Sequence, residues 1–232
     1  MRKAYHEELD RIAESLVEMT HLAASAMSRA TTALLDADVS LADSVIAADA
    51  EIDAMREQVD LLSFDLIALQ QPVATDLRVV VTSMRMSSDI ERMGDLARHV
   101  AKVARLRYPA SAVPPELRGT FREMGAVAEL IVEKTGSVIA ARDVDAAREI
   151  AREDDAMDRL HRTLFEHVTG ADWPHDTETA VDVTLLGRYY ERFADHAVSV
   201  AERVVWIVTG EWGHEANGGH DDVEEIASPS GS

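Results

Sequence analysis

The chain contains no cysteine among its 232 residues. Disulfides, zinc–thiolate sites and thiol catalysis are therefore excluded. Its apolar runs, such as residues 204–208, are far shorter than the roughly 20 residues that a membrane-spanning helix requires. The N-terminal stretch "MRKAYHEELDRIAESL" is charged from its sixth residue onward and does not resemble a signal peptide. We expect a soluble, cytoplasmic protein with no direct membrane insertion.

Glycine and proline are scarce and unevenly placed. No glycine precedes Gly94, and the prolines stand at positions 72, 109, 114, 115, 174 and 229. The long intervals between them are rich in Ala, Leu, Met, Glu and Arg, which favours helices. A glycine-rich phosphate loop, a GxSxG elbow and an HExxH motif are all missing. The sequence therefore gives no indication of an enzyme.

Positive charge is also scarce: 23 Lys and Arg stand against 43 Asp and Glu, a formal net charge of −20. Such a surface repels nucleic acid, so we expect no nucleic-acid partner. It suits divalent cations and basic partner surfaces. The plainer interpretation, that the charge only confers solubility, remains open.

Apolar residues recur at steps of three and four in the first hundred residues, as in packed amphipathic helices. The pattern covers residues 9–33, 41–69 and 86–104 and predicts three helices. Residues 36–40 separate the first two helices and offer N-cap side chains for the second. At the next turn Pro72 should stop a helix, and Thr75 or Asp76 should cap the one that follows.

After a break at residues 107–116 the pattern begins again. Helices are expected from about residue 117, over 141–165 and over about 176–210. At an offset of 100 residues the apolar positions of the third and sixth helices superimpose, and at an offset of 105 those of the second and fifth do so. We therefore predict an all-α fold of two tandem three-helix bundles, residues 1–108 and 116–211. Residues 212–232 show no such pattern, and we expect a disordered acidic tail.

The repeat exposes four pairs of acids with an i, i+4 spacing, which places both carboxylates on one helix face. Like charges so placed repel each other, and the arrangement calls for a compensating group. Each pair lies directly beside the apolar positions of its helix. The eight residues are Asp49, Asp53, Glu91, Asp95, Asp154, Asp158, Glu191 and Asp195.

The pairs are matched in height on neighbouring helices. The midpoints of the first two pairs, residues 51 and 93, are each about 21 residues from Pro72, or roughly 30 Å along an antiparallel hairpin. The midpoints of the other two, residues 156 and 193, are centred on the turn at Trp173 and Pro174. Each half should therefore gather four carboxylates, whose oxygen atoms suit hard cations such as Mg²⁺, Mn²⁺, Ca²⁺ or iron.

Two alternatives remain open. In the first alternative, the acids pair with nearby arginines, such as Asp95 with Arg98, and form only the salt bridges of a helical scaffold. The second alternative is a ferritin-like di-metal enzyme, but such sites add Glu-x-x-His on a helix. The motif occurs in neither copy, since His196 corresponds to Leu96 and His99 to Ser199.

Several segments together are similar to the PhoU family of phosphate-transport accessory proteins: "DAEID", "QQPVATDLRVV", "DIERMGDLARHVAKVA", "EDDAMD" and "LLGRYYERFADHAVSVAERVVWIVTGE". The resemblance covers residues 1 to about 211. It implies two pseudo-symmetric three-helix bundles with metal ions of unknown identity (Mg, Mn, Zn or Fe) on the eight acids named above. Glu51 and Asp155 are extra acids in non-equivalent places, which leaves the ligand set uncertain.

The resemblance also implies a role and partners. A PhoU-like protein is a negative regulator that links the ATPase of the phosphate ABC transporter to a membrane sensor histidine kinase, and that keeps phosphate-starvation genes off when phosphate is plentiful. A homodimer is implied as well, held at the inner face of the membrane only through partners. An adaptor of this kind has no catalytic residues.

Overall fold

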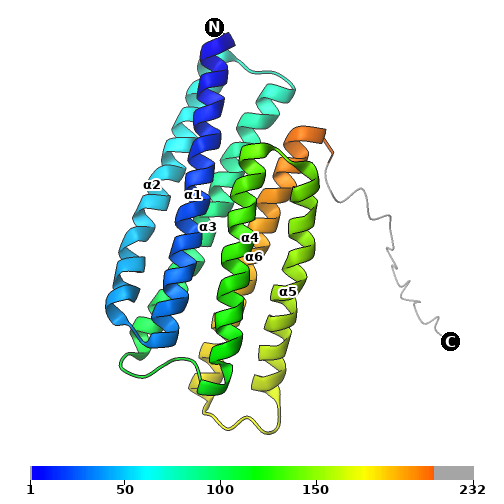
Figure 1. Ribbon diagram of the computed structural model, residues 1–232. Helices are drawn as coiled ribbons and strands as arrows, with labels where there is room; N and C mark the ends of the chain where they lie inside the picture. Colours follow the sequence, from blue (N-terminus) through cyan, green and yellow to red (C-terminus); the bar gives the residue numbers. More distant parts are fainter. Residues whose placement is uncertain (1, 212–232) are drawn as a thin grey trace, which may run out of the picture.

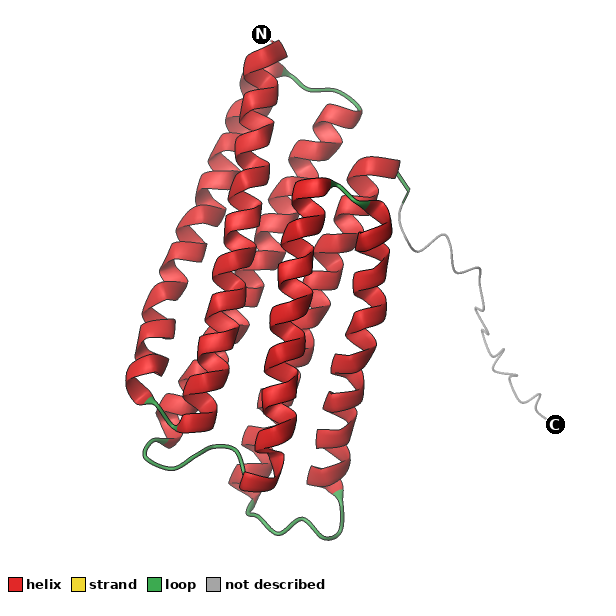
Figure 2. Cartoon of the chain, viewed as in Figure 1, coloured by secondary structure: helices red, strands yellow, loops and turns green. Residues whose placement is uncertain are grey.

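The computed structural model describes residues 2–211, and the predicted acidic tail at 212–232 lies outside the described residues. The described chain is helical throughout, apart from short connections (Figure 2). Six long helices carry the fold, with one 3₁₀ turn, η1, before the fourth. The elements are α1 (Arg2–Asp36), α2 (Val39–Gln70), α3 (Thr75–Arg107), η1 (Pro115–Leu117), α4 (Arg118–Ala141), α5 (Val144–Thr169) and α6 (Thr177–Thr209).

Aspartates begin three of the helices. Asp38, Asp143 and Asp176 hold extended backbone at the N-caps of α2, α5 and α6, and each side chain accepts a hydrogen bond from a backbone N–H of the first turn. Such a cap satisfies one of the N–H groups that a helix start leaves without an intrahelical partner. The N-cap predicted within residues 36–40 is thereby confirmed.

The turn between α2 and α3 differs from the prediction in two respects. Ala74, at φ 48°, precedes α3 and no side chain caps this helix, so the cap predicted at Thr75 or Asp76 is wrong. The backbone instead closes the preceding helix, where the N–H of Gln71 donates to the carbonyl of Ile67 at 3.2 Å. Leu69, expected to face inward, is 77% exposed, because the apolar face of α2 is buried only as far as Leu66.

Four helices form the centre of the molecule and two lie at its edges (Figure 1). Helix α1 packs against α3 and α4, and α6 packs against the same two helices. Helix α2 lies outside against α1 and α3, and α5 lies outside against α4 and α6. The two halves of the sequence thus occupy equivalent positions, as an internal repeat requires.

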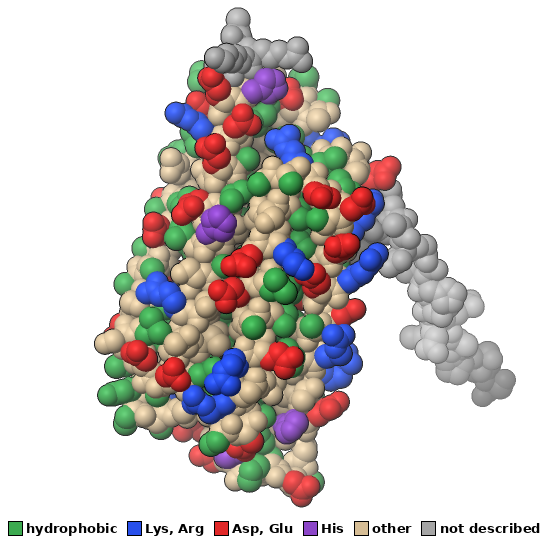
Figure 3. All heavy atoms as spheres, viewed as in Figure 1, with side chains coloured by type: hydrophobic (Ala, Val, Ile, Leu, Met, Phe, Trp, Pro, Cys, Tyr) green, Lys and Arg blue, Asp and Glu red, His purple; other side chains and the backbone are tan. Residues whose placement is uncertain are grey.

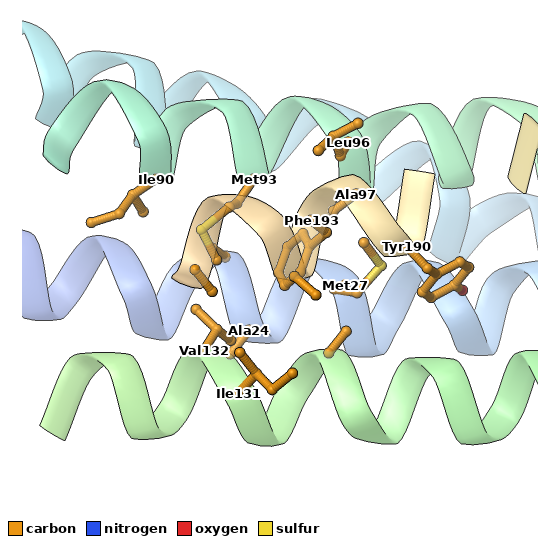
Figure 4. Close-up of a cluster of buried hydrophobic side chains, with 14 of the residues drawn as sticks. Ala24, Met27, Ile90, Met93, Leu96, Ala97, Ile131, Val132, Tyr190 and Phe193 are labelled. Atoms are coloured by element: carbon orange, nitrogen blue, oxygen red, sulfur yellow. The ribbon is translucent and has the colours of Figure 1, made fainter. Parts of the chain in front are cut away.

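One continuous apolar core joins the halves. Figure 4 shows Met93 of α3 and Phe193 of α6, which come from the two halves, in the same cluster of buried side chains. The fully buried Tyr190 shares a hydrogen bond of 2.7 Å with Thr31 of the first half. Since the core crosses between the halves, the domain boundaries at residues 1–108 and 116–211 stay a prediction. Among the described residues, no helix is both long and apolar enough to traverse a bilayer.

Candidate metal site

The first acid cluster comprises Asp49 and Asp53 on α2 with Glu91 and Asp95 on α3. The structure brings these four side chains together: the charges of Asp53 and Asp95 both act on Asp49, and the same two charges act on Glu91. Burial and these neighbouring carboxylates raise the pKa of Glu91, against the opposing effect of Arg92. The predicted matching of heights across the α2–α3 hairpin is therefore observed.

A glycine makes the close approach of α2 and α3 possible. A Cβ atom at Gly94 would lie 2.9 Å from Cδ1 of Ile52 and 3.3 Å from Oδ1 of Asp49. Since real Cβ contacts are almost never as short as 2.9 Å, a side chain here would force the end of the Ile52 side chain to move. Asp49 is accordingly buried, with only 6% of its surface exposed.

Arginine side chains already neutralise much of this first cluster. Arg98 Nη1 lies 2.5 Å from Asp49 Oδ2, and the same guanidinium donates to Asp95. Arg92 reaches Asp95 at 3.5 Å. Burial raises the pKa of Asp49, and Arg98 opposes that rise only in part. The expected pair of Arg98 with Asp95 is confirmed, whereas the bridge to Asp49 on the neighbouring helix was not predicted.

The second acid cluster comprises Asp154 and Asp158 on α5 with Glu191 and Asp195 on α6. Burial and the charges of Asp158, Asp195 and Glu191 raise the pKa of Asp154 to about 7. The extra acid Asp155 adds to the same effect. These four carboxylates are therefore also neighbours, as the heights of the repeat predicted.

The second cluster has little arginine around it. Arg188 donates to Glu191 on the same helix, but within residues 2–211 no ion pair reaches Asp154, Asp158 or Asp195. The sequence explains the difference, because Val198 stands where the first half has Arg98. The two clusters match in carboxylates and differ in counter-charge.

The carboxylates are near one another but do not converge on a common point. Across the described part of the chain, no three Asp, Glu or His side chains are arranged so that they could hold a metal ion as they stand. The donor chemistry of the second cluster nonetheless fits a hard cation: it offers only oxygen ligands, and their mutual repulsion is relieved when positive charge is added. In the first cluster Arg98 already supplies that charge.

A polar contact between the halves was not predicted from the sequence. Asp89 on α3 accepts a hydrogen bond from Arg203 on α6 at 2.8 Å, and His196 Nδ1 lies 3.2 Å from its other oxygen. Asp89 precedes a buried position, Ile90, and has no acid four residues away, so it does not belong to the repeated pairs. This contact joins α3 to α6 and does not belong to either acid cluster.

The described chain therefore belongs to the class of all-helical bundles, with paired carboxylates on its two outer hairpins. Known proteins specify the class further. The PhoU domain matches residues 16–104 and again residues 121–204. The chain is 50% identical over 210 residues to the phosphate-specific transport system accessory protein PhoU homolog 2 of Mycobacterium tuberculosis, covering 90% of this chain and 99% of that protein.

Another relative is PhoU homolog 1 of Mycobacterium leprae, 50% identical over 210 residues, with 90% of this chain and 95% of that protein covered. Among solved structures, the phosphate transport system regulatory protein PhoU from Streptococcus pneumoniae superimposes with a TM-score of 0.81 at 26% identity, over 90% of this chain and 98% of that one. PhoU from Pseudomonas aeruginosa gives a TM-score of 0.80 at 29% identity, over 89% and 100%.

This chain belongs to the PhoU family. The predicted all-α fold with two repeated three-helix units is confirmed. The relatives named above are accessory and regulatory proteins rather than enzymes, which confirms the expectation of a non-enzymatic chain.

Proposed function

We propose that this protein is a phosphate-transport accessory protein that acts as a negative regulator, coupling the ATPase of the phosphate ABC transporter to a sensor histidine kinase. The family membership supports the transport role. The kinase and the ATPase as direct partners, a cytoplasmic location and a homodimer remain parts of the proposal. A helical protein without catalytic groups acts by binding and releasing partners, so its surface charge is the property that regulation would change.

We further propose that divalent or iron-type cations bind the acid clusters. The observation that carries this step is the second cluster, where four carboxylates crowd together and the pKa of Asp154 rises to about 7. Within residues 2–211, Glu191 is the one member of this cluster that pairs with an arginine. Asp154, Asp158, Glu191 and Asp195 would hold the cation there, and the cation would supply the missing positive charge. In the first cluster Asp49, Asp53, Glu91 and Asp95 would do so only with Arg98 displaced.

The salt-bridge scaffold remains a second candidate for one cluster. Arg98 bridges Asp49 and Asp95 from a half-buried position, which is the arrangement that this alternative requires. The two halves would then differ in role: the first cluster would stabilise the α2–α3 hairpin, and the second would bind cations.

Calorimetric titration with Mg²⁺, Mn²⁺ and Zn²⁺ tests the cation site. We expect the double variant Asp154→Asn/Asp195→Asn to lose most binding, and Glu191→Ala to weaken it more than Glu91→Ala does. The matched control is Asp10→Asn/Glu14→Gln, an exposed i, i+4 acid pair on α1. Binding that persists in the double variant would contradict the assignment.

A reporter of phosphate-starvation transcription tests the regulatory role. In a strain lacking this gene and any paralogue, grown in high phosphate, we expect the reporter to be on, and the wild-type gene to switch it off again. A reporter that stays off in the deletion strain would refute negative regulation. Pull-down with the transporter ATPase and with the kinase, each alone, separates the two proposed partners, and sedimentation velocity tests the homodimer.

A further inference from the structure

The outer face of α5 carries four arginines that no other helix covers. Arg148, Arg152, Arg159 and Arg162 follow one another at steps of four, seven and three, so they lie on one side of the helix. All four are exposed. We call them the basic face. The side of α5 that packs against α4 and α6 is the opposite one, with Ala147, Ile150, Met157 and Leu164 buried.

The arginines of the basic face form few ion pairs in the described fold, although Asp155 and Glu166 lie on the same side of α5. Arg148 lies 3.8 Å from Asp145, itself almost fully exposed. Within residues 2–211 no ion pair involves Arg152, Arg159 or Arg162, although Asp155 lies between them in the sequence. Other arginines of this acidic chain bridge helices, as Arg107 and Arg203 do. Figure 3 shows Lys and Arg side chains, with Asp and Glu side chains among them, along the edge of the molecule where α5 runs.

A segment of complementary charge follows α6. Residues 212–232 contain no Lys or Arg and carry five acids, four of them in the run "DDVEE". The five are Glu215, Asp221, Asp222, Glu224 and Glu225. We propose that the basic face of α5 is the docking surface for this acidic C-terminal segment of the same chain.

The lengths allow this contact. Helix α6 ends beside the start of α5 (Figure 1). Helices α5 and α6 are antiparallel, and Asp154 on α5 lies at the height of Glu191 and Asp195 on α6. Arg148, six residues before Asp154, is therefore level with about residue 199. Glu211 lies about 12 residues beyond that point, or roughly 18 Å further along the axis at 1.5 Å per residue. The ten residues from Glu211 to Asp221 span at most about 33–36 Å. The acidic run therefore reaches Arg148 and Arg152 with length left to pass around the helix, and Glu225 reaches further toward Arg159.

The covalent connection makes this occupant more favourable than an anionic surface in solution. An untethered nucleic acid or lipid surface must approach a protein of formal net charge −20, which repels it at long range. The C-terminal segment is already attached, at an effective concentration in roughly the millimolar range for a short connection. The docked segment would cover the basic face, and an acidic partner would have to displace it.

Distance measurement between two spin labels tests the proposal on the full chain. The absence of cysteine allows Thr163→Cys on α5 and Ser228→Cys beyond the acidic run to be labelled specifically. At about 0.01 M salt, where the Debye length is about 30 Å, we expect a narrow short-distance population. At about 1 M salt, where it is about 3 Å, most of that population should move to longer, broader distances.

Charge reversal separates direct pairing from a general effect of charge. Arg152→Glu/Arg159→Glu should abolish the short-distance population, and so should Asp221→Lys/Asp222→Lys. Combining all four changes should restore it. Arg11→Glu/Arg85→Glu, at exposed positions on α1 and α3, changes the net charge equally and should have no effect. Arg11, Arg85, Arg152 and Arg159 are exposed, so replacing them should leave the fold intact, and circular dichroism verifies folding for every variant.

Two results would overturn the proposal. One is a distance distribution that the reversals leave unchanged, or that the combined variant fails to restore. The other is binding of the full chain at low salt to vesicles of phosphatidylcholine and phosphatidylserine that requires Arg152 and Arg159, because the basic face would then serve a lipid surface. Neither result bears on the cation clusters or on phosphate regulation, which are tested separately.

Discussion

Arg98 on α3 crosses to Asp49 on α2, with Nη1 2.5 Å from Oδ2, while the corresponding position of the second half is Val198. This difference changes the charge balance of two hairpins that match in their carboxylates. Asp49 is buried beneath an arginine, and its counterpart Asp154 is held among carboxylates without one. The repeat therefore contains one cluster neutralised by its own chain and one that is not.

Removal of Arg98 should destabilise the protein and create a cation site. Arg98→Ala leaves the buried carboxylate of Asp49 without its partner, and we expect a loss of about 1–3 kcal/mol in the free energy of unfolding. Added Mn²⁺ should recover part of this loss, because the ion can take the place of the guanidinium. Thermal unfolding with and without the metal measures both effects.

The matched control is Arg92→Ala. Arg92 is 62% exposed and reaches Asp95 only at 3.5 Å. Exposed ion pairs contribute about 0–1 kcal/mol, so this variant should unfold nearly as the wild type does. If Mn²⁺ stabilises both variants and the wild type to the same degree, the idea that Arg98 occupies the first site is wrong.

An arginine placed in the second half should have the opposite effect. Val198→Arg puts a guanidinium where the repeat has one in the first half, next to Asp154 and Asp195. Two unit charges a few ångströms apart interact by several kcal/mol at an effective dielectric constant of about 20. Because the guanidinium would neutralise these carboxylates and repel the cation, we expect the Kd for Mn²⁺ to rise by tenfold or more. Titration calorimetry measures it, with Val198→Met as a control of similar length without charge. Unchanged affinity in Val198→Arg would place the cation elsewhere.

The sequence predicted the repeated, periodic part of this molecule well. Helices α2 and α5 pair with α3 and α6 at the heights that the prolines of the turns indicated, because an antiparallel hairpin has a fixed rise per residue. The grouping of the acids into two clusters was predicted from the same count of residues on either side of each turn. These features depend on spacing within a helix or across one turn, and spacing is directly visible in a sequence.

Contacts that depend on which faces of distant helices meet were not predictable. The bridge from Arg98 to Asp49 requires the rotation of α2 about its axis and the close approach at Gly94. The contact of Asp89 with Arg203 requires the order in which the two halves pack. The missing cap at α3 arose because Ala74 takes a positive φ, which no residue-type preference indicates.

The approach of α1 to α4 depends on glycine. A Cβ at Gly125 would lie 2.7 Å from Cγ2 of Thr31, so Gly125→Ala should cost about 1–3 kcal/mol through overpacking. A double-mutant cycle with Thr31→Ala checks the cause, because removing the threonine's outer atoms should make Gly125→Ala less costly. Gly119→Ala is the control, since nothing lies within 4 Å of its Cβ position. Equal cost at both glycines, or additivity in the cycle, would exclude the steric explanation.

The contact of Asp89 should make the junction of the two halves sensitive to acid. Burial alone would raise the pKa of Asp89, but the hydrogen bonds from His196 and Arg203 outweigh it and hold the pKa below its ordinary value. A carboxyl with a lowered folded pKa stabilises the fold above its unfolded pKa of about 3.9, and this contribution is lost as the pH falls through the folded pKa.

Asp89→Asn should therefore cost about 1–3 kcal/mol at neutral pH, and the difference from the wild type should shrink as the pH falls below about 4. Urea unfolding at a series of pH values measures this, with Asp10→Asn on the exposed side of α1 as the control. A penalty that stays constant down to the lowest pH would mean that Asp89 acts through packing and not through its charge. A penalty that shrinks as predicted would assign the α3–α6 contact a charge-dependent share of the stability that joins the two halves.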